Sequence, residues 1–407
     1  RILFKKKFFN YPLSAGEALF KLGFFESFLC GLSFLKAKIL PKKNPKSFHD
    51  WVANSFGERL FKNFFKTYTE KVWGMSCDEI SADWAAQRIK GLNLTSLVLN
   101  SIQFLNFRKN RKVIKTLIKK FKYPKYGPGM MWEKAAEKIK NQNGKISMGI
   151  EAKEFTYDNL KECWKVKCLN KIKNEYVTYE CKRIISSAAM RDVIKNIYPP
   201  LSSKNMAANL KYRDFITVAV MIDKRPNFDD NWIYIHDQNI YAGRIQNYTS
   251  WSTYMAPDNK GCLGLEYFCN EGEKFWNKSD DELKQLAIED LKKLEILKNE
   301  NVIDAYVVRQ KKAYPVYDKD YKKIVREISN EIENNYKNLF LVGRNGMHKY
   351  NNQDHAMMTS ILTIENIKNN KKINDIWDIN VDAEYHEEKK DKSFAMQNIQ
   401  GVPKKFR

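Results

Sequence analysis

The chain has 407 residues, of which 43% are hydrophobic and 13% aromatic. This composition excludes collagen, mucin-like stalks and a fully disordered chain, and the length allows two or three domains. The seven cysteines form no CxxC pair and no zinc-spaced set with histidine. We therefore expect no disulfide framework, no metal site and a reducing, cytoplasmic compartment.

Lysine and arginine number 71 against 48 aspartates and glutamates, which gives a net charge of +23. Such a charge could reflect nucleic acid, a membrane surface or an anionic substrate. Compositional drift is the other explanation, because the chain is rich in the Lys, Asn and Ile that AT-rich genomes encode. The lysines are scattered and no nucleic-acid-binding motif accompanies them, so we favour drift and expect no specific nucleic-acid partner.

The chain begins with Arg1 rather than methionine, and its first residues resemble the middle of a domain, so we expect an N-terminal truncation. Residues 1–13 have the pattern of two short strands joined by a basic turn. Residues 14–122 have helical spacing, with a loop at 41–45 and helix caps at Ser47 and Ser81. The most apolar stretch, 18–35, contains Lys21 and Glu26, so no membrane span is expected.

From Tyr123 onward, turn residues and strand patterns replace the helical spacing. Residues 130–140 predict a helix and 184–188 a buried strand. Three segments rich in β-branched and aromatic residues, 217–222, 231–236 and 262–269, predict an antiparallel sheet. A capping box beginning at Ser279 predicts one helix within this region.

Residues 338–368 predict a compact unit of strand, glycine-containing turn and helix. The strand is 339–342 and the turn 343–346. The apolar residues of the helix, expected to form its buried face, are Met357, Met358, Ile361, Leu362 and Ile364. Residues 369–407 are charged and rich in asparagine, and a loose tail is expected.

Three groups of residues could form a site. The unit 338–368 directs backbone N–H groups and a positive helix end at one point, where phosphates and electron-rich rings bind; an ordinary crossover is the alternative. Aromatic and arginine residues at 68–88 could stack on a ring or bind a pyrophosphate, or form a helical core. Residues 244–247, Trp251, Arg309 and 314–317 could line a substrate face, or be exposed sheet residues.

Several catalytic motifs are absent from the sequence. There is no GxSxG, no HExxH and no Walker A motif. There is also no GxGxxG, since Gly127 and Gly129 are followed by Met-Met-Trp. No residue stands out as a catalytic base, so the catalytic residues stay unknown.

Several blocks together resemble the flavoproteins related to UDP-galactopyranose mutase, protoporphyrinogen oxidase and amine oxidases. Phe64–Arg88 (FFKTYTEKVWGMSCDEISADWAAQR) resembles the mutases' helical segment, and Lys7–Leu13 (KFFNYPL) the strand that enters it. Asn338–Ile367 resembles the C-terminal flavin-binding segment. A bacterial-type branch, described as FAD-dependent oxidoreductase or protoporphyrinogen-oxidase-like, is similar at 127–133, 230–237, 243–248, 264–269 and 313–318.

The resemblance implies an FAD/NAD(P)-binding Rossmann-like domain of mixed α/β class, whose N-terminal GxGxxG part is missing here, with a helical subdomain and an antiparallel-sheet substrate domain. The implied division is 1–13 (end of the first FAD-domain segment), 14–125 (helical), 126–200 (middle FAD-domain segment), 201–312 (substrate sheet), 313–368 (C-terminal FAD-binding segment) and 369–407 (tail). The implied cofactor is FAD. Its implied contacts are Gly343, Arg344, Asn351, Asn352, Gln353 and Asp354.

The resemblance also implies substrate contacts at Trp73, Arg88, Arg309, Tyr314 and Tyr317. One departure concerns a second arginine, which in the mutases follows the first by four residues and binds the substrate diphosphate. Leu92 stands at that position here, and the nearby Lys90 would be only a point charge.

Three functions therefore compete. The first is an FAD-dependent oxidoreductase acting on a small molecule, with a nucleotide-sugar as one candidate substrate. The second is a mutase-type isomerase of nucleotide-sugar rings, which Leu92 disfavours. The third is a non-enzymatic basic protein that binds through charge, which the scattered lysines disfavour. The sequence favours the oxidoreductase and does not predict an oligomeric state.

Overall fold

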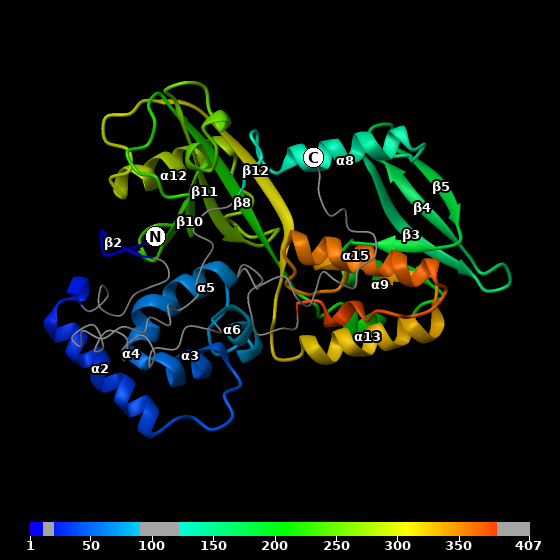
Figure 1. The fold of residues 1–407 in the computed structure, drawn as a ribbon, viewed down its shortest axis with the longest axis horizontal. Coiled ribbons are helices and arrows are strands. Elements are labelled where there is room, and N and C mark those ends of the chain that lie inside the picture. Colours follow the sequence, from blue (N-terminus) through cyan, green and yellow to red (C-terminus); the bar gives the residue numbers. More distant parts are fainter. Residues whose placement is uncertain (11–19, 90–121, 381–407) are drawn as a thin grey trace, which may run out of the picture.

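The computed structural model of the chain describes residues 1–10, 20–89 and 122–380. Its elements form three groups: a layer of helices, a seven-stranded sheet, and a unit of smaller sheets covered by helices (Figure 1). The long strand β12 (Val302–Pro315) runs from the large sheet to the third group. The predicted mixed α/β class is confirmed.

The seven-stranded sheet has the order β12-β8-β11-β10-β9-β1-β2. Its other strands are β1 (Ile2–Phe4), β2 (Lys7–Phe9), β8 (Tyr212–Ile222), β9 (Trp232–Ile235), β10 (Arg244–Asn247) and β11 (Gly261–Cys269). All neighbours pair antiparallel except β1 and β9, which are parallel. The strands predicted at 217–222, 231–236 and 262–269 are thus confirmed, as is the hairpin at the start of the chain.

One face of this sheet packs against helix α12 (Asp280–Lys293), which begins at the predicted capping box of Ser279 and Glu282. The buried side of α12 presents Leu283, Ala287 and Leu291 to alternate strand residues, including Ile216, Val218 and Val220 of β8. Because side chains alternate along a strand, the residues between them point to the opposite face. That opposite face carries the polar and aromatic side chains of the candidate site.

The helical layer contains α2 (Phe24–Ile39), α3 (Phe48–Phe56), α4 (Glu58–Leu60), the π-helix η1 (Phe61–Lys66), α5 (Thr67–Trp73) and α6 (Ala82–Ile89). Ser47 caps α3 through the backbone N–H of Asp50, as predicted. The junctions of α4, η1 and α5 keep right-handed helical torsions, so 58–73 forms one continuous helical rod. Gly74 ends this rod in the left-handed conformation at φ 64°.

The third group surrounds a two-stranded parallel sheet of β6 (Ile184–Ser186) and β13 (Leu339–Leu341). A four-stranded sheet, β5-β4-β3-β7, lies beside it; its strands are β3 (Ile150–Asp158), β4 (Cys163–Asn170), β5 (Glu175–Cys181) and β7 (Ile197–Tyr198). The helices are α8 (Gly129–Asn141), α9 (Met190–Lys195), α10 (Lys204–Ala207), α13 (Tyr321–Asn335), α14 (Gly343–Gly346) and α15 (Gln353–Lys368). Short turns at α11 (Tyr248–Trp251), η2 (Thr253–Met255) and η3 (Ile376–Asp378) complete the described elements.

The predicted buried face of α15 is wrong at three of its five residues, whereas Leu362 is buried and Met358 half-buried. Met357, Ile361 and Ile364 are exposed, whereas Thr359 and Thr363 are buried beside Leu362. The Thr359 hydroxyl accepts a hydrogen bond from the backbone N–H of Gly343 at 3.0 Å. The inward face is therefore fixed by a close polar contact with the turn after β13, and the apolar stripe is turned outward.

All seven cysteines lie in the described ranges and are free thiols. No described helix combines the length and the apolar character that a membrane crossing requires.

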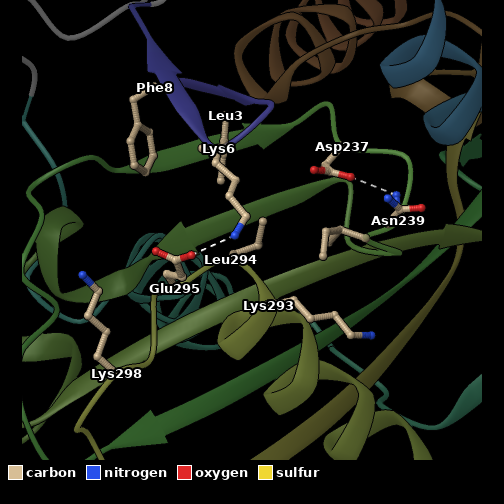
Figure 2. A pocket seen from close by; sticks show the side chains of 10 residues that line it. Leu3, Lys6, Phe8, Asp237, Asn239, Lys293, Leu294, Glu295 and Lys298 are labelled. Atoms are coloured by element: carbon tan, nitrogen blue, oxygen red, sulfur yellow. Dashed lines mark hydrogen bonds and ion pairs between the residues drawn. The ribbon is translucent and has the colours of Figure 1, made fainter.

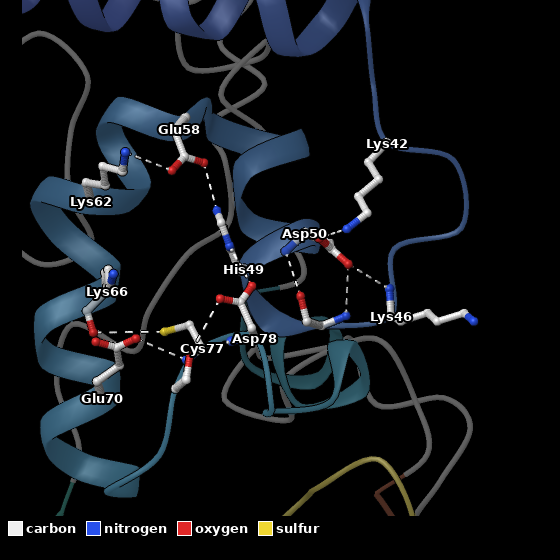
Figure 3. A network of polar contacts seen from close by, with 12 residues as sticks. Lys42, Lys46, His49, Asp50, Glu58, Lys62, Lys66, Glu70, Cys77 and Asp78 are labelled. Atoms are coloured by element: carbon white, nitrogen blue, oxygen red, sulfur yellow. Dashed lines mark hydrogen bonds and ion pairs between the residues drawn. The ribbon is translucent and has the colours of Figure 1, made fainter.

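A polar network joins the helices of the first group through His49 of α3 (Figure 3). Its ring nitrogens lie 2.8 Å from Asp78 and 2.8 Å from Glu58, and the ring stacks on Phe61 at 4.3 Å between centroids. Burial acts to lower the pKa of His49, but the two carboxylates outweigh it, so the pKa is raised above 6.5.

This network predicts a pH-dependent stability of the helical layer. A raised pKa means that the contribution of His49 is complete below pH 6.5 and is lost as the pH rises through the raised value. Chemical unfolding measured across this range should show the loss in the wild type and much less of it in His49→Gln. A His49→Gln variant with an unchanged pH profile would assign the dependence to other groups.

Candidate functional site

The turn after β13 brings the C-terminal unit close to β6. Gly343 has φ +77°, which favours glycine, and a Cβ on Gly346 would lie 2.6 Å from the carbonyl oxygen of Ser186. The glycines of the predicted turn therefore allow a close approach of two backbones. The segment forms the short helix α14 rather than an open turn.

The loop from α14 to α15 is held by buried polar contacts. The side-chain amide of Asn351 donates to the carbonyl of Gly343 at 3.1 Å, and Asn351 is almost fully buried. Arg344 donates to the carbonyls of Asn351 at 2.7 Å and Ala313 at 3.1 Å. These three predicted cofactor residues fix the shape of the loop.

The remaining predicted cofactor residues lie where α15 begins. Asn352 precedes the helix and is half-buried, whereas Gln353 and Asp354 are exposed. The first backbone N–H groups of a helix lack intrahelical acceptors and carry the positive end of the helix dipole. A capping box engages two N–H groups at this end: the Asn352 side chain accepts from the backbone N–H of His355, and the backbone N–H of Asn352 donates to His355 Nδ1 at 3.2 Å. The donors left at the start of this 16-residue helix are the backbone N–H groups of the exposed Gln353 and Asp354, where an anionic or electron-rich ligand stays a prediction.

A group of aromatic rings and Arg344 connects this loop to the large sheet. Tyr314 of β12 stacks on Tyr350 with centroids 5.6 Å apart and an interplanar angle of 13°. The guanidinium of Arg344 lies 5.3 Å from the Tyr314 ring and 4.9 Å from the Tyr350 ring. Trp73 of α5 approaches both tyrosines at 6.1 and 6.3 Å. Three segments distant in sequence thus meet at one aromatic surface.

The neighbouring sheet face carries a buried ion pair. Arg244 of β10 donates from Nε to Glu266 of β11 at 2.7 Å and from Nη2 to the Tyr314 hydroxyl at 3.0 Å. Gln246 donates to the second oxygen of Glu266 at 2.5 Å. The positive charge of Arg244 is therefore compensated within the protein. Burial raises the pKa of Tyr314, so its phenol is protonated at neutral pH.

Helix α5 covers this face through its side chains. Tyr68 stacks on His236 at 5.0 Å with an interplanar angle of 7° and meets Tyr234 edge-on at 5.4 Å. Burial, reinforced by the charge of Lys71, lowers the pKa of His236 to about 3. The histidine is therefore neutral at pH 7.

Two cations fasten α5 to the sheet. The Lys71 ammonium donates to four carbonyl oxygens at the end of β9 and in the loop that joins it to β10; these belong to Asp237 and Ile240 at 2.8 Å and to Ile235 and Ala242 at 3.3 Å. From β8, the buried Arg213 donates to the carbonyls of Val72 at 2.9 Å and Phe268 at 3.0 Å. A Cβ on Gly74 would lie 2.6 Å from the Arg213 guanidinium, so the glycine is needed for this contact.

The structure brings some of the predicted substrate residues together and separates others. Trp73 and Tyr314 lie at the aromatic surface described above. Tyr317 lies in the core: it stacks on Tyr321 at 4.1 Å, and its hydroxyl accepts from the backbone N–H of Tyr350 at 2.8 Å. The Arg88 side chain lies outside the described residues.

Arg309 lies on the other face of the large sheet. It is opposite Ile216, which packs under α12, and its guanidinium donates to Asp280 and to the carbonyl of Lys278. Tyr314 lies beside Phe215 and Phe268 on the site face. Residues five apart along a strand point to opposite faces, which separates Arg309 from Tyr314, and the register shift between Gln310 and Tyr314 leaves the faces unchanged because it adds two residues to β12.

Sequence reasoning did not name three residues of this surface. They are Tyr68, Tyr350 and Glu266. A charged residue within a strand whose neighbours are apolar was the available signal for Glu266, because such a residue needs a buried partner. Tyr68 and Tyr350 lay in segments already singled out, without a pattern that distinguished them from core aromatics.

Two hollows of the described surface lie away from these residues. One, of about 330 Å³, is lined by Lys6, Asp237, Glu295 and their neighbours, beside α12 and the first hairpin (Figure 2). The other, of about 260 Å³, lies near Phe228 and Thr249. Neither includes the start of α15.

Comparison with known proteins supplies the fold family. A scan against protein-family models and a search of curated proteins found no match. The structure of reduced UDP-galactopyranose mutase is similar, with a TM-score of 0.73 at 16% identity over 88% of this chain and 74% of that one. A candidate protoporphyrinogen oxidase from Exiguobacterium sp. 255-15 gives 0.60 at 11% identity over 84% and 72%. The chain therefore has the fold of the FAD-binding, Rossmann-like flavoenzymes.

The Lys71 contacts predict a loss of stability on substitution. Lys71→Met would leave four carbonyl oxygens without their donor, and we expect unfolding to become easier by about 2–4 kcal/mol. Lys62→Met, on the same helical rod, removes only an exposed ion pair and should cost less than about 1 kcal/mol. Urea unfolding of both variants measures the difference; equal costs would show that Lys71 does not fasten α5.

Proposed function

We propose that the chain is an FAD-dependent oxidoreductase that acts on a small molecule in the cytoplasm, with the division into FAD-binding, helical and substrate segments expected from the sequence. The start of α15 carries the proposal, since its accessible donors adjoin an aromatic surface with compensated charge. Flavin needs both features: a planar ring to rest on apolar surface, and donors for the edge that becomes negative on reduction.

The six cofactor residues divide into two roles in this proposal. Gln353 and Asp354 hold the flavin ring, because they are the exposed members of the set, and Asn352 caps the helix beside them, because its backbone N–H and side chain are engaged by His355. Gly343, Arg344 and Asn351 position them, because their polar groups are engaged within the loop. When bound, FAD supplies the acceptor for a hydride from a substrate C–H bond.

The substrate surface is proposed to consist of Tyr314 and the sheet face beside it, with Trp73, which is only 4% exposed, packed against the tyrosine. Stacked tyrosines and a protonated Tyr314 phenol can orient a ring and donate one hydrogen bond to it. Tyr317 and Arg309 are not part of this proposal, because both are engaged elsewhere. Arg88 stays a proposed contact.

The charges of the site favour oxidation over a mutase reaction. A mutase must hold a substrate diphosphate. Such a group is bound by arginine side chains whose charge is not already neutralised by the protein. Arg244 is neutralised by Glu266, and Arg344 donates to two carbonyls. Leu92, the departure noted in the sequence, lies outside the described residues. The likeness to UDP-galactopyranose mutase supports the mutase only as the second candidate.

Substituting Gln353 tests whether its backbone N–H holds the cofactor. Proline is compatible with the first position of a helix, and the extended torsions of Asn352 (φ −77°, ψ 178°) suit a following proline. Gln353→Pro therefore removes the donor while α15 remains, and FAD should bind about tenfold or more weakly. Gln353→Ala keeps the N–H and is the matched control. If the two variants bind FAD with equal affinity, the backbone N–H of Gln353 does not hold the cofactor.

The reaction itself is tested with the protein expressed from its complete open reading frame. We expect the visible absorption of bound flavin, and its bleaching under anaerobic conditions by an oxidisable substrate. A mutase would instead convert the ring form of UDP-galactose only after reduction by dithionite, with no net change in the flavin. A folded but colourless protein that does not take up FAD would contradict both reactions.

A further inference from the structure

Helix α2 exposes an unusual amount of apolar surface. The side chains of Phe24, Phe28, Leu32, Leu35 and Ile39 are between 49% and 90% exposed. Their spacing of four, four, three and four residues places them on one line along a helix. Phe20, Phe25 and Leu40, which lie beside this line or near its ends, are 88%, 74% and 72% exposed. We call these eight residues the α2 stripe. The 16-residue helix that carries most of it is about 24 Å long.

The opposite side of α2 makes polar contacts with the protein, and these contacts prevent the helix from rotating to turn the stripe inward. Glu26 accepts two hydrogen bonds from Arg59, both at 2.7 Å, and a third from Asn63 at 2.9 Å. The Ser33 hydroxyl accepts from the Arg59 backbone N–H at 3.1 Å. Turning the stripe inward would break these contacts and would leave Glu26 without partners, so the stripe has to face outward.

The close packing of the α2 backbone against α4 also requires the stripe to face outward. A Cβ on Gly57 would lie 2.8 Å from the backbone nitrogen of Phe34, so α2 touches the start of α4 with little space between the backbones. Cys30 is buried in the same side of the helix. Small and polar residues thus form the tight contact, with Leu29 and Phe34 half-buried beside it, and the residues of the stripe lie on the side away from the protein.

The charge around the stripe is of one sign. Between residues 20 and 46 the sequence has six lysines and a single acid, Glu26, which is bound to Arg59. Lys36, Lys38 and Lys43 are exposed and form no ion pair with any described carboxylate. A second copy docked by the same stripe would bring lysines against lysines, with no acid to compensate them. An anionic surface matches both the apolar line and the lysines beside it.

We propose that the α2 stripe docks on an anionic lipid surface. The helix lies in the plane of the interface, its phenylalanines and leucines enter the boundary of the acyl chains, and the lysines reach the phosphate groups. Such a helix rests on the membrane without crossing it, which agrees with the absence of a described helix able to span one. The proposal is independent of the flavin chemistry.

Vesicle sedimentation of the full chain tests the proposal. We expect binding to phosphatidylcholine vesicles that contain phosphatidylglycerol, weaker binding to phosphatidylcholine alone, and a loss of binding as salt is added. The variant Phe24→Ser/Phe28→Ser/Leu32→Ser should bind roughly tenfold or more weakly. A sample without vesicles controls for aggregation.

The matched control removes exposed apolar residues elsewhere. Leu160 and Ile172, 97% and 79% exposed, lie in turns of the four-stranded sheet, and Leu160→Ser/Ile172→Ser should bind like the wild type. Failure of the wild type to bind anionic vesicles overturns the proposal. Equal weakening by the control also overturns it. If the wild type does not bind vesicles and the stripe variant has a different oligomeric state from the wild type, the stripe is instead an interface with a second copy of the chain.

Discussion

The attachment of α5 to the large sheet is the constraint on which the candidate site depends. Lys71 reaches from the helix into a ring of four carbonyl oxygens, and Arg213 reaches from the sheet to the carbonyl end of the helix. A buried cation is stable only where several acceptors surround it, so each contact admits one position of the helix. That position sets Tyr68 on His236 and Trp73 beside Tyr314.

The same use of cations extends across the site. Arg344 and Arg244 look like ligand-binding arginines in the sequence, yet one donates to backbone carbonyls and the other to Glu266. Their charged groups hold protein segments together and are not available to bind a substrate. What remains is the half-buried stacked pair Tyr314 and Tyr350 and the start of α15, a combination suited to a planar, electron-rich group more than to a free phosphate.

The sequence predicted the elements that depend on local pattern. Enrichment in β-branched and aromatic residues identified β8 and β11, and capping residues located the starts of α3 and α12 at Ser47 and Ser279. Alternation also separates Arg309 from Tyr314, because five residues along one strand is an odd spacing, and the expectation that both contact a substrate came from the family resemblance. The partner of Arg309 could not be predicted, because the docking of α12 on the sheet brings Asp280 to it.

Helices α2 and α15 show a second limit of pattern reasoning. Periodicity shows that two faces of a helix differ, but not which one packs inward. In α2 the inward face is set by Glu26 and Arg59, and in α15 by the bond from Gly343 to Thr359. For α15 this has a consequence for chemistry. Because a hydrogen bond to the turn itself fixes the helix, the donors at its start keep a constant relation to the end of β13, and a cofactor held there would meet a preorganised site.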